Sequence, residues 1–120
     1  MTPRAIHVAE YAILALLLAV AAWTVRDQIG IAFWLLLIGP DLALVVAPAL
    51  GRMPGRGLLP PRAVPLYNAF HSFVPVLLVW GVLVYLGADQ TPLLGWAIHI
   101  SADRALGFGL RGPDGGQALI

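Results

Sequence analysis

Four long apolar runs constrain what this 120-residue chain can fold into. Each run is close to the ~20 apolar residues that an α-helix needs to cross the hydrocarbon core of a bilayer. Inside a bilayer the backbone must satisfy its own hydrogen bonds, so helices are the expected structure. The sequence therefore predicts an all-α integral membrane bundle of four transmembrane helices, forming a single domain over residues 1–120. The predicted spans are residues 8–25, 29–50, 66–86 and 92–110.

The composition agrees with a membrane protein and argues against several other classes. Hydrophobic residues make up 60% of the chain and charged residues 11%, whereas soluble domains are usually about 45–50% apolar. The net charge of +1 gives no reason to expect a nucleic-acid partner. The sequence has no cysteine, which excludes disulfides, thiolate ligands and cysteine nucleophiles. The expected partner is the lipid bilayer, with a homo-oligomer or a larger membrane complex as further candidates.

The first two runs are both expected to form membrane spans, but only the second is expected to be interrupted. The first is interpreted as a retained span, because it is longer than the ~7–15-residue apolar core of a signal peptide. In the second, Pro40 removes a backbone donor, and Gly39 lets a neighbouring helix approach closely. We expect the second helix to be broken or kinked at Gly39-Pro40, which would free carbonyl groups for use by a polar cavity.

The arginines predict the orientation of the bundle. With four spans, only Arg26 falls on one side of the membrane, and the other six arginines fall on the opposite side. The positive-inside rule places that opposite side in the cytoplasm, so both termini are expected to be cytoplasmic. The tail, residues 111–120, has no apolar period and is expected to be weakly ordered. The six cytoplasmic arginines are Arg4, Arg52, Arg56, Arg62, Arg104 and Arg111.

Ionisable residues inside the apolar runs are the main functional signal. His99 and Asp103 lie four residues apart, on one helical face and about one turn from each other. Such residues in a lipid-embedded segment are rare and by default mark a functional site. At a rise of ~1.5 Å per residue, they lie ~16 Å and ~10 Å from the cytoplasmic end of their span. Asp41 lies at ~13 Å and His71 at ~8–10 Å by the same measure. The sequence therefore predicts one polar cluster in the cytoplasmic half of the bundle.

These residue types form a metal-ligand set. Neutral imidazole and carboxylate suit a divalent zinc, manganese or iron ion, and such a set leaves positions open for water or substrate. Asn68, one turn before His71, is predicted to orient a ligand or substrate. Either Glu10 or the carboxylate of the cluster that is not needed as a ligand is predicted to take a proton from a metal-activated water, which would make the site resemble that of a hydrolase. The predicted metal ligands are Asp41, His71, His99 and Asp103.

The same residues also have structural interpretations, and the sequence leaves the choice open. His71 and His99 could simply form hydrogen bonds that hold two membrane helices together. Asp41 could cap the second half of a broken helix. Arg104 is expected to extend to the cytoplasmic interface, because it does not share a helix face with its neighbour Asp103. Whether the chain is an enzyme is therefore not decided by these residues.

Two other functions are weighed against a metal site. Two histidines on adjacent spans could ligate a b-type haem, but Asp41 and Asp103 are unfavourable neighbours for the propionates of a porphyrin, so haem is disfavoured. A small chain without a sizeable soluble part also fits a non-catalytic accessory subunit of a larger, energy-transducing membrane complex. In that case the polar cluster would be structural.

Three segments carry a resemblance to a known family. They are GPDLALV at residues 39–45, YNAFHSFVP at residues 67–75 and WAIHISADRALGFGLR at residues 96–111. The chain resembles the small bacterial membrane proteins of the domain of unknown function 4260 family. This sequence departs from the family pattern at Phe108, where tyrosine is usual, and in its tail. The resemblance implies a bacterial inner membrane location. A looser similarity to metal-dependent hydrolases of the inner membrane implies a metal site at the four predicted ligands.

Overall fold

The computed structural model describes residues 1–118, and within this range the fold is all-α, as predicted. Three short 3-10 helices join the α-helices: η1 (Arg26–Gln28), η2 (Gly39–Asp41) and η3 (Pro61–Ala63). The β pairing in the described part of the chain is one isolated bridge between Arg111 and Gln117. The α-helices are α1 (Pro3–Thr24), α2 (Ile31–Ile38), α3 (Leu42–Leu50), α4 (Val64–Phe70), α5 (Phe73–Leu86) and α6 (Pro92–Ala105).

The helices support a membrane protein, but they do not reproduce four equal spans. Two segments, Pro3–Thr24 and Ile31–Leu50, are long and apolar enough to cross a bilayer. A third exists if Pro61–Phe70 and Phe73–Leu86, which meet at an angle of 48°, form one bent span. The predicted fourth helix over residues 92–110 is wrong at its end, because α6 stops at Ala105. Its 14 residues extend only about 21 Å, less than the ~30 Å of a bilayer core.

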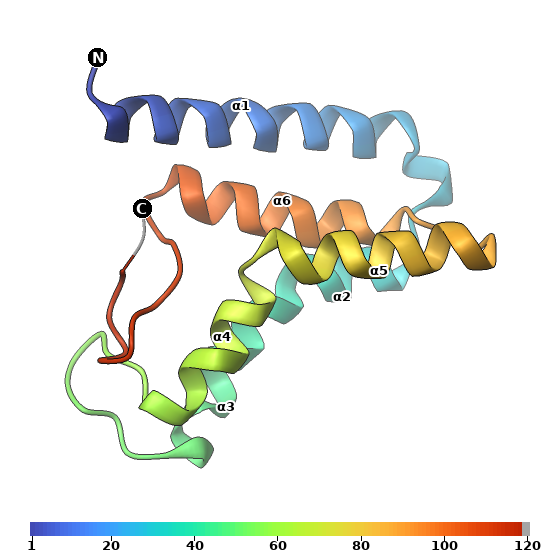
Figure 1. Cartoon of the computed structure of the whole chain (residues 1–120). Coiled ribbons are helices and arrows are strands. Elements are labelled where there is room, and N and C mark those ends of the chain that lie inside the picture. Colours follow the sequence, from blue (N-terminus) through green and yellow to red (C-terminus); the bar gives the residue numbers. More distant parts are fainter. Residues whose placement is uncertain (119–120) are drawn as a thin grey trace.

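Helix α6 is the centre of the fold. It lies between α1 on one side and α2 and α5 on the other (Figure 1). Gly95 allows this packing, because a Cβ at that position would collide with the backbone carbonyl of Phe33 in α2. Seven of its residues are buried, more than in any other helix among residues 1–118. They are Leu93, Gly95, Trp96, His99, Ile100, Ser101 and Arg104.

Helices α3 and α4 form a second packing unit that runs away from the layer containing α1, α5 and α6 (Figure 1). The 48° bend between Pro61–Phe70 and Phe73–Leu86 contributes to this divergence. Helix α2 passes through the 3-10 turn η2 before α3 begins, and α4 ends at Phe70, before α5 starts at Phe73. The core of this unit consists of Ala43, Ala47, Leu59, Ala63, Val64 and Tyr67.

The tail is more ordered than the sequence predicts as far as residue 118, and residues 119–120 lie outside the described part. The Arg111 guanidinium donates to the carbonyls of Gly57 and Gly115 at 2.9 and 2.8 Å. Gly115 has a φ of 87° and packs so closely on the backbone of Leu59 that any side chain there would collide with it. The tail therefore forms a turn that is fastened to the 51–60 loop.

Gly95→Ala should destabilise the packing of α6 on α2, because the added methyl group overlaps a backbone carbonyl that cannot move independently. We expect a loss on the order of 1–3 kcal/mol, measured as a lower midpoint of thermal unfolding in detergent by circular dichroism. Gly81→Ala is the matched control, since nothing lies within 4 Å of a Cβ in that position of α5. An equal loss in both variants would contradict the close α2–α6 contact.

Candidate metal centre

Four side chains that are far apart in the sequence meet at one point, as predicted. Each of Asp41, His71, His99 and Asp103 offers one ligand atom, and these four atoms all lie within 4.8 Å of one another. His71 Nε2 lies 3.3 Å from both Asp41 Oδ1 and Asp103 Oδ2. His99 Nε2 lies 3.2 Å from Asp41 Oδ1 and 3.3 Å from Asp103 Oδ2. The two Nε2 atoms are themselves 3.3 Å apart.

Two of these side chains lie where an α-helix is interrupted, and the other two lie on the regular helix α6. Asp41 is the last residue of η2, and His71 follows the last residue of α4. His99 and Asp103 project from the same face of α6, one turn apart. The side chains of His71 and His99 are only 2% and 9% exposed, that of Asp103 is 23% exposed, and that of Asp41 is 53% exposed. The centre is therefore closed on the histidine side and open at Asp41.

The backbone determines which nitrogen of each imidazole faces the centre. His71 Nδ1 lies 2.8 Å from the carbonyl oxygen of Tyr67, and His99 Nδ1 lies 2.8 Å from that of Leu37. A carbonyl oxygen can only accept, so both Nδ1 atoms must carry the proton. In each neutral ring, Nε2 is then left with a lone pair that points at the centre. This is the arrangement by which proteins orient a histidine ligand for a metal.

Two backbone carbonyls at interruptions of the α-helices hold the centre together. The carbonyl of Leu37 lies in the last turn of α2, where the 3-10 turn η2 with Pro40 follows, and it accepts from His99. Pro75 has no N–H for the carbonyl of His71, four residues earlier, and that carbonyl accepts from Arg104 Nη2 at 3.1 Å. Both helix breaks therefore expose an acceptor, and α6 supplies both donors.

An aromatic stack supports His71 from the side of the tail. The Tyr67 ring lies on the His71 imidazole with centroids 3.9 Å apart and planes inclined by 10°. The Arg111 guanidinium lies 4.8 Å from the Tyr67 centroid. Tyr67 is buried, with 3% exposure. The ring of His71 is thus held both by a hydrogen bond and by packing.

Two residues predicted as catalytic lie away from the four ligands. The Asn68 amide donates to the Arg111 carbonyl at 2.9 Å and accepts from the Arg111 backbone N–H at 2.7 Å. Asn68 therefore fastens the tail to α4. Glu10 is exposed on α1 and lines a pocket with Tyr11 and Phe73.

The sequence interpretation missed the role of Arg104. It was expected to extend to the membrane interface, but it is 8% exposed and lies inside the protein, with its guanidinium 5.5 Å from the Tyr11 ring centroid. The expectation is wrong because the carbonyl of His71 needs a donor there. Pro75, four residues after His71, was the available signal.

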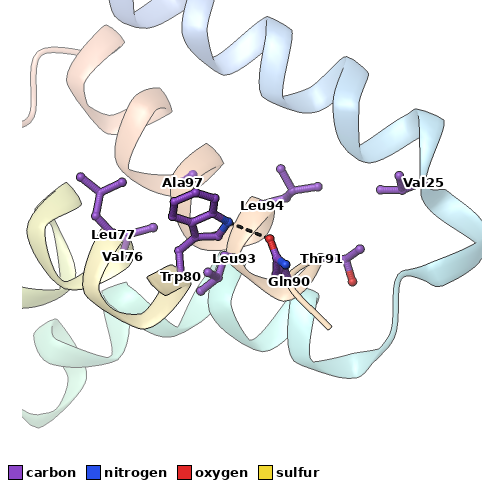
Figure 2. A pocket seen from close by; sticks show the side chains of 9 residues that line it. All are labelled: Val25, Val76, Leu77, Trp80, Gln90, Thr91, Leu93, Leu94 and Ala97. Carbon is purple, nitrogen blue, oxygen red and sulfur yellow. Dashed lines mark hydrogen bonds between the residues drawn. The ribbon is translucent and has the colours of Figure 1, made fainter. Parts of the chain in front are cut away.

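The apolar pocket in Figure 2 offers no comparable chemistry. It has a volume of about 430 Å³ and lies beside the α5–α6 turn, lined by residues such as Val76, Leu77 and Leu93. Gln90, one of its few polar residues, accepts a hydrogen bond from Trp80 Nε1 at 2.7 Å. Within the described part of the chain, the His/Asp cluster therefore offers side chains that could hold a metal ion.

Comparison with known proteins identifies the family. The family described as domain of unknown function (DUF4260) matches residues 4–118. The chain belongs to the DUF4260 family. The match covers all four residues of the cluster and both helix breaks. No curated protein and no solved structure matches the chain. The function of this DUF4260 protein must therefore be argued from its own geometry.

Arg104→Leu should destabilise the protein, because the carbonyl of His71 would lose its donor while remaining buried. We expect a loss of about 1–3 kcal/mol, measured by thermal unfolding in detergent. Arg104→Lys, which retains a cationic donor, should lose less. Arg26→Leu is the control, since Arg26 is exposed on η1 and should change stability little. If Arg104→Leu behaved like Arg26→Leu, the proposed support of the helix break would be wrong.

Proposed function

We propose that the cluster binds one divalent transition-metal ion. The supporting observation is that two oriented Nε2 lone pairs and two carboxylate oxygens face one another at 3.2–3.3 Å. These acceptor atoms need protons or a cation between them, and one metal ion serves all four at once. Tetrahedral zinc, with ligands at about 2.0–2.1 Å, requires neighbouring ligand atoms about 3.3–3.4 Å apart. The five separations that involve an imidazole nitrogen, 3.2–3.3 Å, agree with zinc, while manganese and ferrous iron also accept this ligand set.

We further propose that the four ligands are not equivalent. His71, His99 and Asp103 are the less exposed three, and such a set of two imidazoles and one carboxylate is typical of catalytic metal sites. Asp41 is half exposed, so it is the ligand that can yield its place to water. The proposed reaction is hydrolysis: water attacks the substrate, gives one proton to the Asp41 carboxylate, and that proton passes to the leaving group.

The proposed setting is the bacterial inner membrane with both ends of the chain on the cytoplasmic side. The start of α1 and the end of α6 lie at the same end of the bundle (Figure 1). A Cβ on Gly107 would lie 3.8 Å from the Arg4 guanidinium, which supports the same arrangement. The arginine distribution favours the cytoplasm for this end.

Purified protein should contain one zinc, manganese or iron ion per chain, measured by elemental analysis after gel filtration in mild detergent. His71→Ala and His99→Ala should each abolish stoichiometric binding, because each removes a ligand from the closed side of the centre. His7→Ala is the matched control and should retain the metal, since the His7 ring packs against Tyr11. Metal that remained after loss of either cluster histidine would refute the site. With cobalt in place of the native ion, intense visible bands would indicate tetrahedral coordination and weak bands octahedral coordination.

Asp41→Asn should separate metal binding from hydrolysis. We expect this variant to keep a bound ion but to lose about 100-fold or more in the rate of p-nitrophenyl acetate hydrolysis, because the amide cannot take the proton of water. Asn68→Ala and Glu10→Ala should retain most of the activity, since the Asn68 side chain is bonded to the Arg111 backbone and Glu10 lines a separate pocket on α1. Full activity in Asp41→Asn would contradict the role of Asp41 as proton acceptor.

A non-catalytic accessory subunit is the second candidate, and the exposure of α1 favours it. Only 6% of the most apolar window of α1 is buried, so either lipid or a larger membrane partner must cover that face. Size-exclusion chromatography of the native protein in mild detergent distinguishes the two. Recovery alone or as a small homo-oligomer with bound metal supports the enzyme. Recovery only in a large assembly, without metal, supports the subunit.

A further inference from the structure

The open side of the metal centre faces an apolar surface. The neighbours of Asp41 on the exposed face of the α2–α3 segment are large and apolar: Ile38 is 64% exposed, Leu42 57% and Val45 72%. Ile38 and Val45 lie three residues before and four residues after Asp41, so they share its side of the helix, and Leu42 is the next residue along the chain. The other three ligands are much less exposed than Asp41. A molecule that reaches the centre through this opening must therefore cross an apolar stripe.

The depth of Asp41 indicates that lipid covers this stripe. Asp41 lies near the middle of Ile31–Leu50, a 20-residue segment apolar enough to span a membrane. In a transmembrane orientation, each end of the segment is about 13–15 Å from Asp41 along the helix. That distance is close to half the ~30 Å hydrocarbon core of a bilayer. The exposed carboxylate is thus placed among acyl chains and not at the aqueous surface.

An apolar groove lies beside the centre. It has a volume of about 280 Å³ and lies between α2, α3 and α4. Its lining includes Pro40 and Leu42, the chain neighbours of Asp41, and Phe70, the chain neighbour of His71. A chain lying in this groove would hold its polar end beside the centre.

We propose that the substrate is a membrane lipid, which enters sideways from the bilayer and presents an acyl ester to the centre. This proposal rests on the proposed hydrolytic function and adds the substrate class. Of the polar bonds in a lipid, the acyl ester lies closest to the hydrocarbon, so it has the shortest distance to move inward to reach the centre. The oxygen of water attacks the ester carbonyl carbon, and the bond from that carbon to the alcohol oxygen breaks. One proton of water passes through Asp41 to the departing alcohol, which leaves a fatty acid and a lysolipid.

Spin labels can show what covers the opening. The chain has no cysteine, so Ile38→Cys and Val45→Cys each give a single labelling position. In phosphatidylcholine vesicles, both labels should relax more with lipid-soluble oxygen than with a water-soluble nickel chelate. Leu17→Cys on the exposed face of α1 and Arg56→Cys in the 51–60 loop are the lipid and water references. If the labels at positions 38 and 45 relaxed more with the nickel chelate, as the label at position 56 should, entry of a lipid from the bilayer would be overturned. Labels shielded from both reagents would overturn it as well.

The reaction can be tested in the same vesicles. Metal-loaded protein in phosphatidylcholine vesicles should release fatty acid, detected by mass spectrometry, and Asp41→Asn should abolish the release. Val45→Trp should raise the KM for lipid about threefold or more, because it narrows the opening, and leave p-nitrophenyl acetate hydrolysis unchanged. Leu17→Trp is the control and should alter neither.

The outcomes separate this inference from the proposed function. Hydrolysis of p-nitrophenyl acetate without release of fatty acid would overturn the lipid substrate and leave the metal-dependent hydrolase standing. Release of a phosphorylated head group with both acyl chains retained would overturn the acyl ester. Bound metal with no hydrolysis of either substrate would overturn the hydrolytic function itself.

Discussion

Two hydrogen bonds from imidazole to backbone determine how this centre is built. By donating Nδ1–H to the carbonyls of Tyr67 and Leu37, His71 and His99 turn their Nε2 atoms toward each other and toward two carboxylates. Four acceptor atoms brought this close repel one another unless positive charge lies between them. The arrangement would be expensive as a purely structural network, in which each neutral imidazole should donate toward the carboxylates. The direction of the two Nδ1 bonds therefore calls for positive charge at the centre, which a bound cation or protonated imidazoles would supply.

The interruptions of the α-helices, at η2 and between α4 and α5, contribute directly to the centre. A continuous α-helix uses its carbonyls internally, so it has none to offer to a side chain of another helix. Pro75 lacks the N–H that would occupy the carbonyl of His71 in a continuous α-helix, and the carbonyl of Leu37 lies in the last turn of α2, where the 3-10 turn η2 replaces the α-helix. His99 and Arg104 take those two positions, and both project from α6. The same side chains thus join α6 to both broken segments and place two of the ligands.

The sequence predicted the class of fold and the cluster because apolar length, helix spacing and the depth of each ionisable residue in its span can all be read along the chain. Apolar runs identify helices, and a spacing of four identifies a shared face, as with His99 and Asp103. The rest depended on contacts between segments. The end of α6 at Ala105 and the anchoring of the tail by Asn68 and Arg111 arise from packing that no periodic pattern reports. The burial of Arg104 was missed for a related reason, since its partner is a backbone carbonyl freed by a proline on another helix.

The four ligands differ in exposure, and this difference relates metal binding and folding to the proposed reactivity of the centre. Charged groups in an apolar protein are tolerated only when they are paired, and an ion bound by all four side chains would offset the burial of Asp103. If every ligand were enclosed, the ion would be saturated and would serve only for stability. Asp41 differs because its side chain is half exposed, and it ends a 3-10 turn instead of lying within a packed α-helix. Binding and folding are then coupled through the three less exposed ligands, while the fourth remains free to exchange with water. The proposed centre thus combines three fixed ligands with one movable carboxylate that can also accept a proton, an arrangement suited to metal-assisted hydrolysis.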